Sequence, residues 1–173
     1  SETAYGRLLH AELFAGKENS GKLVTLIKQH ARLHGEDTQA ALLLIDGPPG
    51  IGCPVISACA GTQLGLIITE PGLAGIHDMK RVLGVLEHFH VPTLICINKA
   101  DLYPQGSAEI RAFAAQAGIA VLGEIPYDAH IPQAMLAGQP ITLAYPQAAA
   151  AQAITRIWQQ VRARLLNPQE AAE

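Results

Sequence analysis

A run of apolar residues that ends in a single acidic residue constrains the fold of this chain most. Residues 41–45 read Ala-Leu-Leu-Leu-Ile, and Asp46 follows directly. A short uninterrupted apolar run is typical of a strand buried on both faces, as in parallel sheets covered by helices. Such a strand ends at the carboxyl edge of the sheet, where open α/β folds bind ligands. The run therefore predicts a buried parallel strand over 41–46 that delivers Asp46 to a ligand site.

The turn after this run has the composition of a phosphate-facing loop. Residues 47–50 read Gly-Pro-Pro-Gly, a rigid turn in which the Gly50 amide can approach a phosphate closely. Nucleotide-hydrolysing proteins place the Asp that holds Mg²⁺ in this way, although an Asp that only caps the turn is the alternative. No G-x-x-x-x-G-K-[ST] loop, which would cradle the phosphates, occurs anywhere in the chain. The sequence thus carries part of a nucleotide site.

Composition limits the class of protein and its partners. The chain has 173 residues, of which 49% are hydrophobic and 16% charged, enough for one domain with a sizeable core. We expect a single domain over 1–166 and a disordered tail over 167–173. The net charge of −3, without a basic run, gives no indication of nucleic acid or an anionic membrane as a partner. No apolar stretch approaches the ~18 residues of a membrane span.

The three cysteines indicate the compartment. Cys53, Cys59 and Cys96 include no C-x-x-C pair, which argues against a disulfide framework and against a self-contained zinc site. We therefore expect a reducing compartment and a cytoplasmic protein.

Apolar strand patterns alternate with helical patterns along the chain. The expected strands cover 5–14, 41–46, 64–69, 93–97 and 120–123, and the expected helices cover 22–33, 76–90, about 107–117 and 148–166, with a short helix opening at Pro54. Parallel strands need crossover connections, so this order predicts an α/β domain with helices on both faces of a mostly parallel sheet.

Two further loops are expected at the same sheet edge as Asp46. Glu70-Pro71-Gly72 follows one expected strand, and Asn98-Lys99-Ala100-Asp101 follows the next. An Asn side chain can both donate to and accept from a purine edge, and an Asp can accept from a pair of N–H groups. The N-K-x-D pattern therefore indicates base recognition, although an ordinary Asn-Asp turn is the alternative.

Taken together, these motifs resemble the MinD/Mrp class of P-loop ATPases, and within it the members that contain an inserted ferredoxin domain. The motifs in chain order are Asp46-Gly-Pro-Pro-Gly-Ile-Gly-Cys-Pro54, Thr69-Glu70-Pro71, Cys96-Ile-Asn-Lys-Ala-Asp101 and Ile125-Pro-Tyr-Asp128. Residues 16–24 also fit the segment that follows the ferredoxin insert in that subfamily. The resemblance covers about residues 5–145. It implies a three-layer, Rossmann-like fold of the P-loop type without the Walker A strand.

The resemblance implies a role for each matching residue. Asp46 would be the Walker B acid that reaches Mg²⁺ through water, and Gly50 would offer its amide near the γ-phosphate. Asn98 would contact the adenine, with Lys99 and Asp101 beside it. Pro126 and Asp128 would line the base pocket. Family members bind ATP and typically work as nucleotide-bridged dimers.

The missing phosphate loop has a structural consequence. In P-loop folds the Walker B strand lies beside the strand that leads into the phosphate loop. This chain would therefore lack a central strand and leave unpaired backbone edges in its sheet. We expect that the chain alone neither binds ATP tightly nor hydrolyses it.

Cys53 lies seven residues after Asp46, the offset at which the related nitrogenase iron protein carries a cysteine ligand of its bridging 4Fe–4S cluster. The resemblance therefore implies a possible cluster ligand at Cys53, with an electron-transfer or client protein as partner. The alternative is a small apolar cysteine that starts a helix.

Two other readings of the whole chain stay open. A GTPase of the related metal-insertion group would read guanine with the complete N-K-x-D motif. A non-catalytic interaction module would have kept the sheet and lost the nucleotide.

Overall fold

The computed structural model describes residues 2–3, 6–10 and 20–166, which fall into two compact units with their boundary between Thr62 and Gln63. Each unit is described by itself. The predicted tail over 167–173 lies outside the described residues, and the prediction of a single domain over 1–166 stays a prediction.

The first unit is built around two helices. Helix α1 spans Ser20–Thr38 and helix α2 spans Cys53–Cys59. An antiparallel hairpin of two short strands, β1 (Glu2–Thr3) and β2 (Gly6–Arg7), precedes them. The helices start in close contact, because a Cβ built on Gly21 would lie 2.8 Å from the Cβ of Cys53. Only a glycine at position 21 allows this approach.

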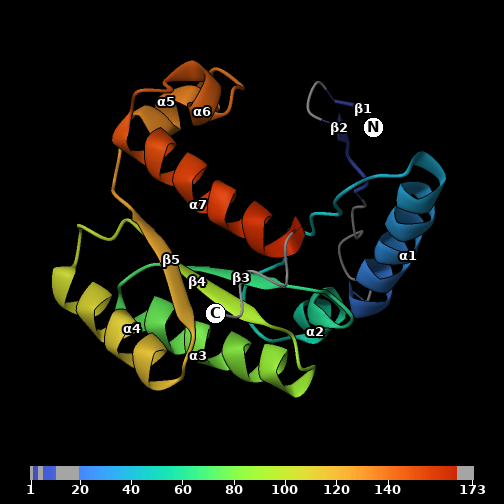
Figure 1. Ribbon diagram of the computed structural model, residues 1–173, viewed down its shortest axis with the longest axis horizontal. Coiled ribbons are helices and arrows are strands. Elements are labelled where there is room, and N and C mark those ends of the chain that lie inside the picture. The colour runs from blue at the N-terminus through green and yellow to red at the C-terminus, as the bar shows by residue number, and fades with distance from the viewer. Residues whose placement is uncertain (1, 4–5, 11–19, 167–173) are drawn as a thin grey trace. The chain divides into compact units, whose positions relative to one another are not determined.

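The second unit contains a parallel three-stranded sheet in the order β3-β4-β5 (Figure 1). Its strands are β3 (Gly65–Thr69), β4 (Thr93–Asn98) and β5 (Ala120–Ile125). Its helices are α3 (Leu73–His88), α4 (Pro104–Gln116), α5 (His130–Leu136), α6 (Ile141–Ala144) and α7 (Ala149–Leu166). The alternation of strands and helices predicted from the sequence is confirmed here.

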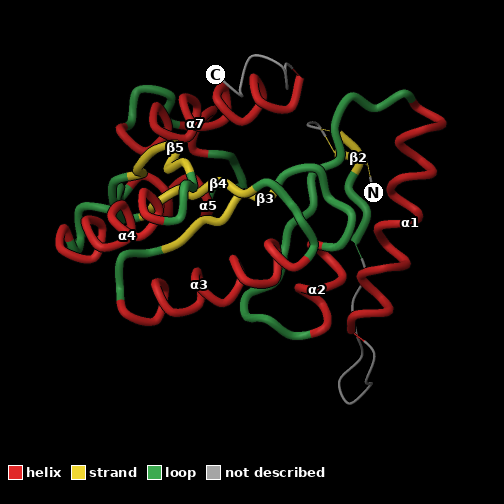
Figure 2. Tube along the Cα trace, turned by 60° about the horizontal axis from the view of Figure 1, so that its bottom comes forward, coloured by secondary structure: helices red, strands yellow, loops and turns green. Residues whose placement is uncertain are grey.

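Helices pack on both faces of this sheet, as predicted (Figure 2), although Leu66 and Ile68 of β3 remain exposed. Helix α7 packs over one face, where Leu94 and Cys96 of β4 join a core with Ala150, Ile157 and other α7 residues. Helices α3 and α4 pack on the opposite face, and Ile95 and Ile97 have no exposed surface. The central strand is therefore buried on both sides, and its end is held firmly at the edge where Asn98 stands.

The predicted strand over 41–46 is wrong. The segment is irregular, and no described strand pairs with it. Its side chains are exposed instead of buried, apart from the half-buried Ile45, and Leu44 shows 79% of its full accessible area. A strand is stable only when neighbouring backbone satisfies its N–H and C=O groups, and an apolar run without a partner cannot supply that.

Smaller differences concern element ends and short helices. The strand predicted over 5–14 is confirmed only at Gly6–Arg7. Residues 8–10 are irregular and 11–14 lie outside the described residues. The patterns over 130–144 did not predict α5 and α6, because both helices are short and lie among Gly and Pro residues.

Candidate functional site

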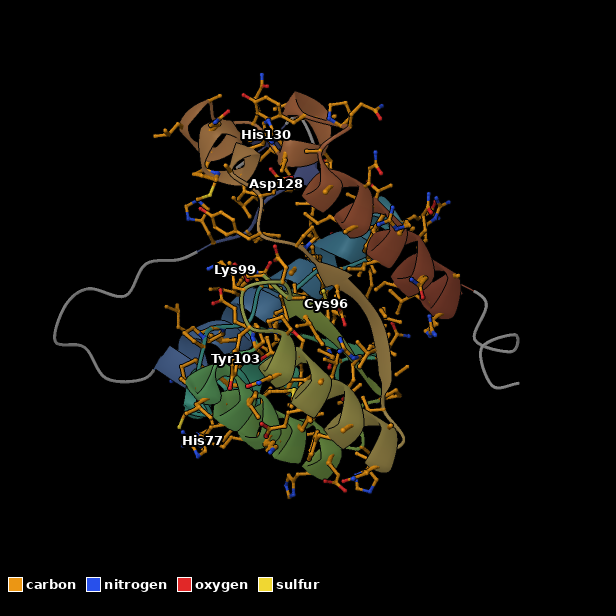
Figure 3. All side chains as sticks on the ribbon, turned by 90° about the vertical axis from the view of Figure 1, so that its left-hand side faces the viewer. His77, Cys96, Lys99, Tyr103, Asp128 and His130 are labelled. Atoms are coloured by element: carbon orange, nitrogen blue, oxygen red, sulfur yellow. The ribbon has the colours of Figure 1, made fainter. Side chains whose placement is uncertain are left out.

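The loops that leave β3, β4 and β5 open at one edge of the parallel sheet. Asn98 is the last residue of β4, paired in register with Ile125 at the end of β5. Figure 3 shows Lys99 and Asp128 at this edge, with His130 beside Asp128 and Cys96 set back within the sheet. The predicted base-recognition residues of the second unit therefore share one edge.

Lys99 is held by an ion pair to the neighbouring loop. Its Nζ lies 2.7 Å from Oε1 of Glu70, the residue that follows β3. The Lys99 backbone has φ 51°, a left-handed conformation that costs about 1 kcal/mol for a residue with a Cβ. The sequence placed Glu70 at this edge without assigning it a role. Glu70 directly follows β3, and Lys99 directly follows β4. These matching positions at the ends of neighbouring strands could have predicted the ion pair between the two residues.

Asp101 joins the loop after β4 to the loop after β5. Its Oδ1 accepts a hydrogen bond from the backbone N–H of Tyr127 at 2.6 Å. The N–H of Ala100 also donates to the carbonyl of Ile125 at 3.1 Å. Asp101 and Pro126 line an open surface pocket of about 350 Å³ together with Ala100, Pro104, Arg111 and Glu124. The N-K-x-D turn is thus fastened to the segment that the resemblance places at the base.

Asp128 organises the segment that follows. Its Oδ1 accepts from the backbone N–H of His130 at 3.0 Å and faces His130 Nδ1 at 2.7 Å, while Oδ2 accepts from the N–H of Ala150 at 3.2 Å. The backbone hydrogen bond from His130 is the main cause that lowers the pKa of Asp128, followed by the His130 side chain and the Ala150 N–H. The carboxylate therefore links the loop after β5 to the first turn of α7.

Asn98 differs from these neighbours. It is half-buried at the end of β4, and among the described residues its side-chain amide makes no hydrogen bond. The charged side chains around it are already bonded within the protein. Asn98 thus offers a free donor and a free acceptor on a rigid strand end.

The remaining predicted residues belong to the first unit. Asp46 is exposed on the irregular segment 41–50. Gly50 has φ 89°, a conformation that glycine adopts without the strain that a Cβ would cause. The backbone bends at residues 49–50, and the phosphate-facing turn expected over 47–50 stays a prediction.

Cys53 is the one exposed cysteine. It begins α2, with Gly52 at the N-cap and Pro54 in the first turn. Burial raises the pKa of Cys96 to about 11 and also raises the pKa of Cys59, so both thiols stay protonated at neutral pH. Among the described residues no group of three or more His, Cys, Asp or Glu side chains could hold a metal ion. Any cluster bound at Cys53 would need ligands from outside the described residues.

Lys28 fixes the other end of α2. Its Nζ donates to the carbonyls of Ser57, Ala58 and Ala60 at 2.9, 2.7 and 2.8 Å. These carbonyls have no helical partner at the C-terminus of so short a helix. Burial, and secondarily the nearby Arg32, lower the pKa of Lys28. No sequence pattern predicted this contact, because the two helices are joined only by the tertiary fold.

Comparison with protein families matches residues 34–162, more than half of the chain, to the ParA family described as NUBPL iron-transfer P-loop NTPase. The chain belongs to this family. The resemblance of the motifs to the MinD/Mrp class of P-loop ATPases is therefore confirmed, and with it the assignment to the P-loop NTPases.

Individual proteins are also similar to this chain. An uncharacterized protein of Methanocaldococcus jannaschii is 40% identical over 95 residues, 55% of this chain and 33% of the relative. An iron–sulfur cluster carrier protein of Aquifex aeolicus is 27% identical over 127 residues, 66% of this chain and 35% of the relative. This chain thus spans about a third of the length of these relatives.

A solved structure supports the same fold. The cell division ATPase MinD of Pyrococcus furiosus superposes with a TM-score of 0.66 at 22% identity, covering 83% of this chain and 58% of that one. The MinD-like α/β fold predicted from the sequence is therefore confirmed. Within the described residues, no helix has both the length and the apolar character that crossing a membrane requires.

Proposed function

We propose that this chain is the base-recognition and Walker B part of an ATP-binding and ATP-hydrolysing protein. The observation that carries the proposal is the free amide of Asn98 at the carboxyl end of the central strand, in a chain of the P-loop NTPase family. An adenine presents one acceptor and one donor on its Watson–Crick edge, which a single Asn side chain can match. Asn98 would bind the base, and Pro126 would form a wall of its pocket.

The bonding of Asp101 favours ATP over the alternative GTP. To read guanine, a carboxylate accepts from two N–H groups with its two oxygens. Oδ1 of Asp101 already accepts from Tyr127 N–H. This bond leaves further lone pairs on the carboxylate, but it fixes the carboxylate toward the 126–128 loop, and an adenine needs no acceptor from Asp101.

Asp46 has the chemistry for Mg²⁺. Its carboxylate is exposed, and carboxylate oxygen is a ligand type that Mg²⁺ prefers, often through bound water. When bound, the metal would neutralise charge on the phosphates. Asp46 would hold the metal's water shell and Gly50 would turn its amide toward the terminal phosphate.

An iron–sulfur role is the finer part of the proposal. The Aquifex aeolicus relative is named an iron–sulfur cluster carrier, and Cys53 is an exposed thiol at the end of the switch segment that begins at Asp46. Cys53 of two chains in a dimer would supply two of the four thiolate ligands of a shared 4Fe–4S cluster, and the other two would have to come from residues outside the described ones. A cytoplasmic location, and a client or electron-transfer partner, belong to this proposal.

The first test uses the full-length protein that contains this chain. Asn98→Ala should weaken ATP binding by about tenfold, because it removes two hydrogen bonds to the base. Asp46→Asn should keep ATP binding and lower Mg²⁺-dependent hydrolysis by on the order of a hundredfold. Titration calorimetry and phosphate release measure the two effects. Gln116→Ala, which changes an exposed amide at the end of α4, is the control and should change neither.

The 173 residues alone provide the complementary measurement. Without a phosphate-binding loop they should neither bind ATP tightly nor hydrolyse it, and Mg²⁺-dependent turnover by this chain would contradict the assignment of its residues. If the full-length protein does not bind nucleotide, and nucleotide leaves the exchange of the Asn98 and Gly50 amides unchanged, the non-catalytic interaction module is the better reading.

A further inference from the structure

All four charged side chains at the carboxyl edge, Glu70, Lys99, Asp101 and Asp128, bond backbone or side chains of neighbouring segments. Glu70 is bonded to Lys99, Asp101 to the Tyr127 N–H, and Asp128 to both His130 and the Ala150 N–H. These contacts run in order along the edge, from the loop after β3 to the first turn of α7. None of them needs a ligand to form.

From this arrangement we infer that Asp101 and Asp128 are positioning residues, which hold the 126–128 loop in place while Asn98 alone discriminates the base. The inference rests on the proposed function, since it assigns roles within that nucleotide site. It differs from the roles expected from the motifs, in which both carboxylates face the ligand.

The hydrogen-bond geometry supports a positioning role for Asp101. Its partner is a backbone N–H in the middle of the 126–128 loop, on a different strand connection and 26 residues further along the chain. Tyr127 itself is 53% exposed, so little apolar packing of its side chain holds this loop. A charge-assisted bond to the backbone therefore restrains the middle of this loop.

Asp128 restrains the same loop from its other end. Both of its oxygens are occupied, and the side chain is only 10% exposed. The Ala150 N–H that it accepts belongs to the first turn of α7, one of the helix positions that lacks an intrahelical acceptor. The loop is thus anchored to the loop after β4 through Asp101 and to α7 through Asp128. A loop restrained in this way loses little freedom when a base binds beside it.

The preference of the protein for one base over another distinguishes two roles of Asp101, direct contact with the base and positioning of the 126–128 loop. If its carboxylate read the base directly, Asp101→Asn would favour xanthine, which has a carbonyl where guanine has its amino group and can accept from the Asn amide. If Asp101 positions the loop, the Asn oxygen still accepts from Tyr127 N–H. Asp101→Asn then leaves the preference for adenine over guanine and xanthine as in the wild type.

The experiment measures the affinities of ATP, GTP and xanthosine triphosphate in the full-length protein. Asp101→Ala should weaken all three by a similar factor, roughly three- to tenfold, because it removes one hydrogen bond that orders the loop. Asp101→Asn should restore most of the affinity. Asp78→Asn, which removes an exposed carboxylate of α3, is the matched control and should change nothing. A gain of xanthosine triphosphate binding in Asp101→Asn would overturn the inference.

Amide hydrogen exchange of the nucleotide-free protein tests the restraint itself. The Tyr127 amide should exchange faster in Asp101→Ala, and the Ala150 amide faster in Asp128→Ala. Unchanged rates would overturn the inference while ATP binding, and with it the proposed function, stayed intact. A wild-type protein without nucleotide binding would instead overturn the proposed function, and the exchange rates would still report whether the two carboxylates hold the loop.

Discussion

At the scale of residues, polar side chains on a rigid edge divide into bonded and free ones. Charged groups that already have partners stabilise the loops that carry them, and a free amide on a strand end remains for a ligand. Asn98 is such an amide. The N-K-x-D motif predicts base recognition for Asp101 as well, but the Asp101 carboxylate already accepts a hydrogen bond from the protein backbone. A motif read from sequence names the residues that gather at an edge, but it does not say which of them the protein uses for itself.

Lys28 provides the residue-scale prediction for the first unit. Lys28→Met keeps the apolar stem and removes three hydrogen bonds to the carbonyls that end α2. Leaving these carbonyls without a donor should lower the free energy of unfolding by about 2–3 kcal/mol. Urea denaturation followed by circular dichroism measures the loss, and exchange of the amides in 53–62 places it at α2.

The control for this prediction is Lys22→Met, the same substitution at an exposed position of α1. It should change the free energy of unfolding by less than about 0.5 kcal/mol. Equal changes in the free energy of unfolding for the two substitutions would mean that the hydrogen bonds of Lys28 to the end of α2 do not stabilise the unit.

At the scale of elements, the local apolar pattern was enough to predict a helix or strand wherever that element buries its own apolar face. The alternation of helices and strands over 64–125 was predictable because each strand there pairs with a neighbour from the same stretch. The strand over 41–46 has equally strong apolar character, yet no described strand pairs with it. Pairing is a tertiary property, so the apolar pattern alone could not reveal its absence.

The same limit applies to the candidate site. Its place at the carboxyl edge follows from the strand order and was predictable. The bond between Asp101 and Tyr127 and the ion pair between Lys99 and Glu70 depend on loop conformation, including the left-handed backbone of Lys99. Side-chain types at a given spacing do not specify such conformations.

Packing of α4 against the loop after β3 gives the element-scale prediction. A methyl group on Gly106 would overlap the carbonyl oxygen of Pro71 and the ring of Tyr103. Gly106→Ala should therefore destabilise the second unit by about 1–3 kcal/mol, although alanine favours a helix more than glycine does. Urea unfolding monitored by the fluorescence of Trp158, the single tryptophan, measures the effect.

Gly84→Ala is the matched control on α3, where an added Cβ meets nothing within 4 Å. Here helix propensity acts alone, and the substitution should stabilise the unit by about 0.5–1 kcal/mol. The two substitutions are chemically identical, so effects of the same sign would contradict the close approach of α4 to Pro71.

At the scale of the whole molecule, the sheet of the second unit has an open side. β3 pairs only with β4 among the described residues, so the backbone groups on its other edge have no strand partner there. Ile68 is 60% exposed and Leu66 37% exposed on this strand, which carries neither a charge nor a proline. Proteins usually protect an edge strand with such residues, because a bare apolar edge pairs with other chains.

The 173-residue chain should therefore self-associate without nucleotide as its concentration rises. Ile68→Lys places a charge on the β3 edge and should raise the concentration needed for association by about tenfold or more, since burial of an isoleucine contributes about 2 kcal/mol. Sedimentation velocity over a range of concentrations measures this shift. Leu136→Lys replaces a side chain that is 91% exposed on α5, away from the sheet edge, and should leave the association unchanged. An equal shift in both variants would assign the association to general surface hydrophobicity, and the open edge of β3 would then have no part in it.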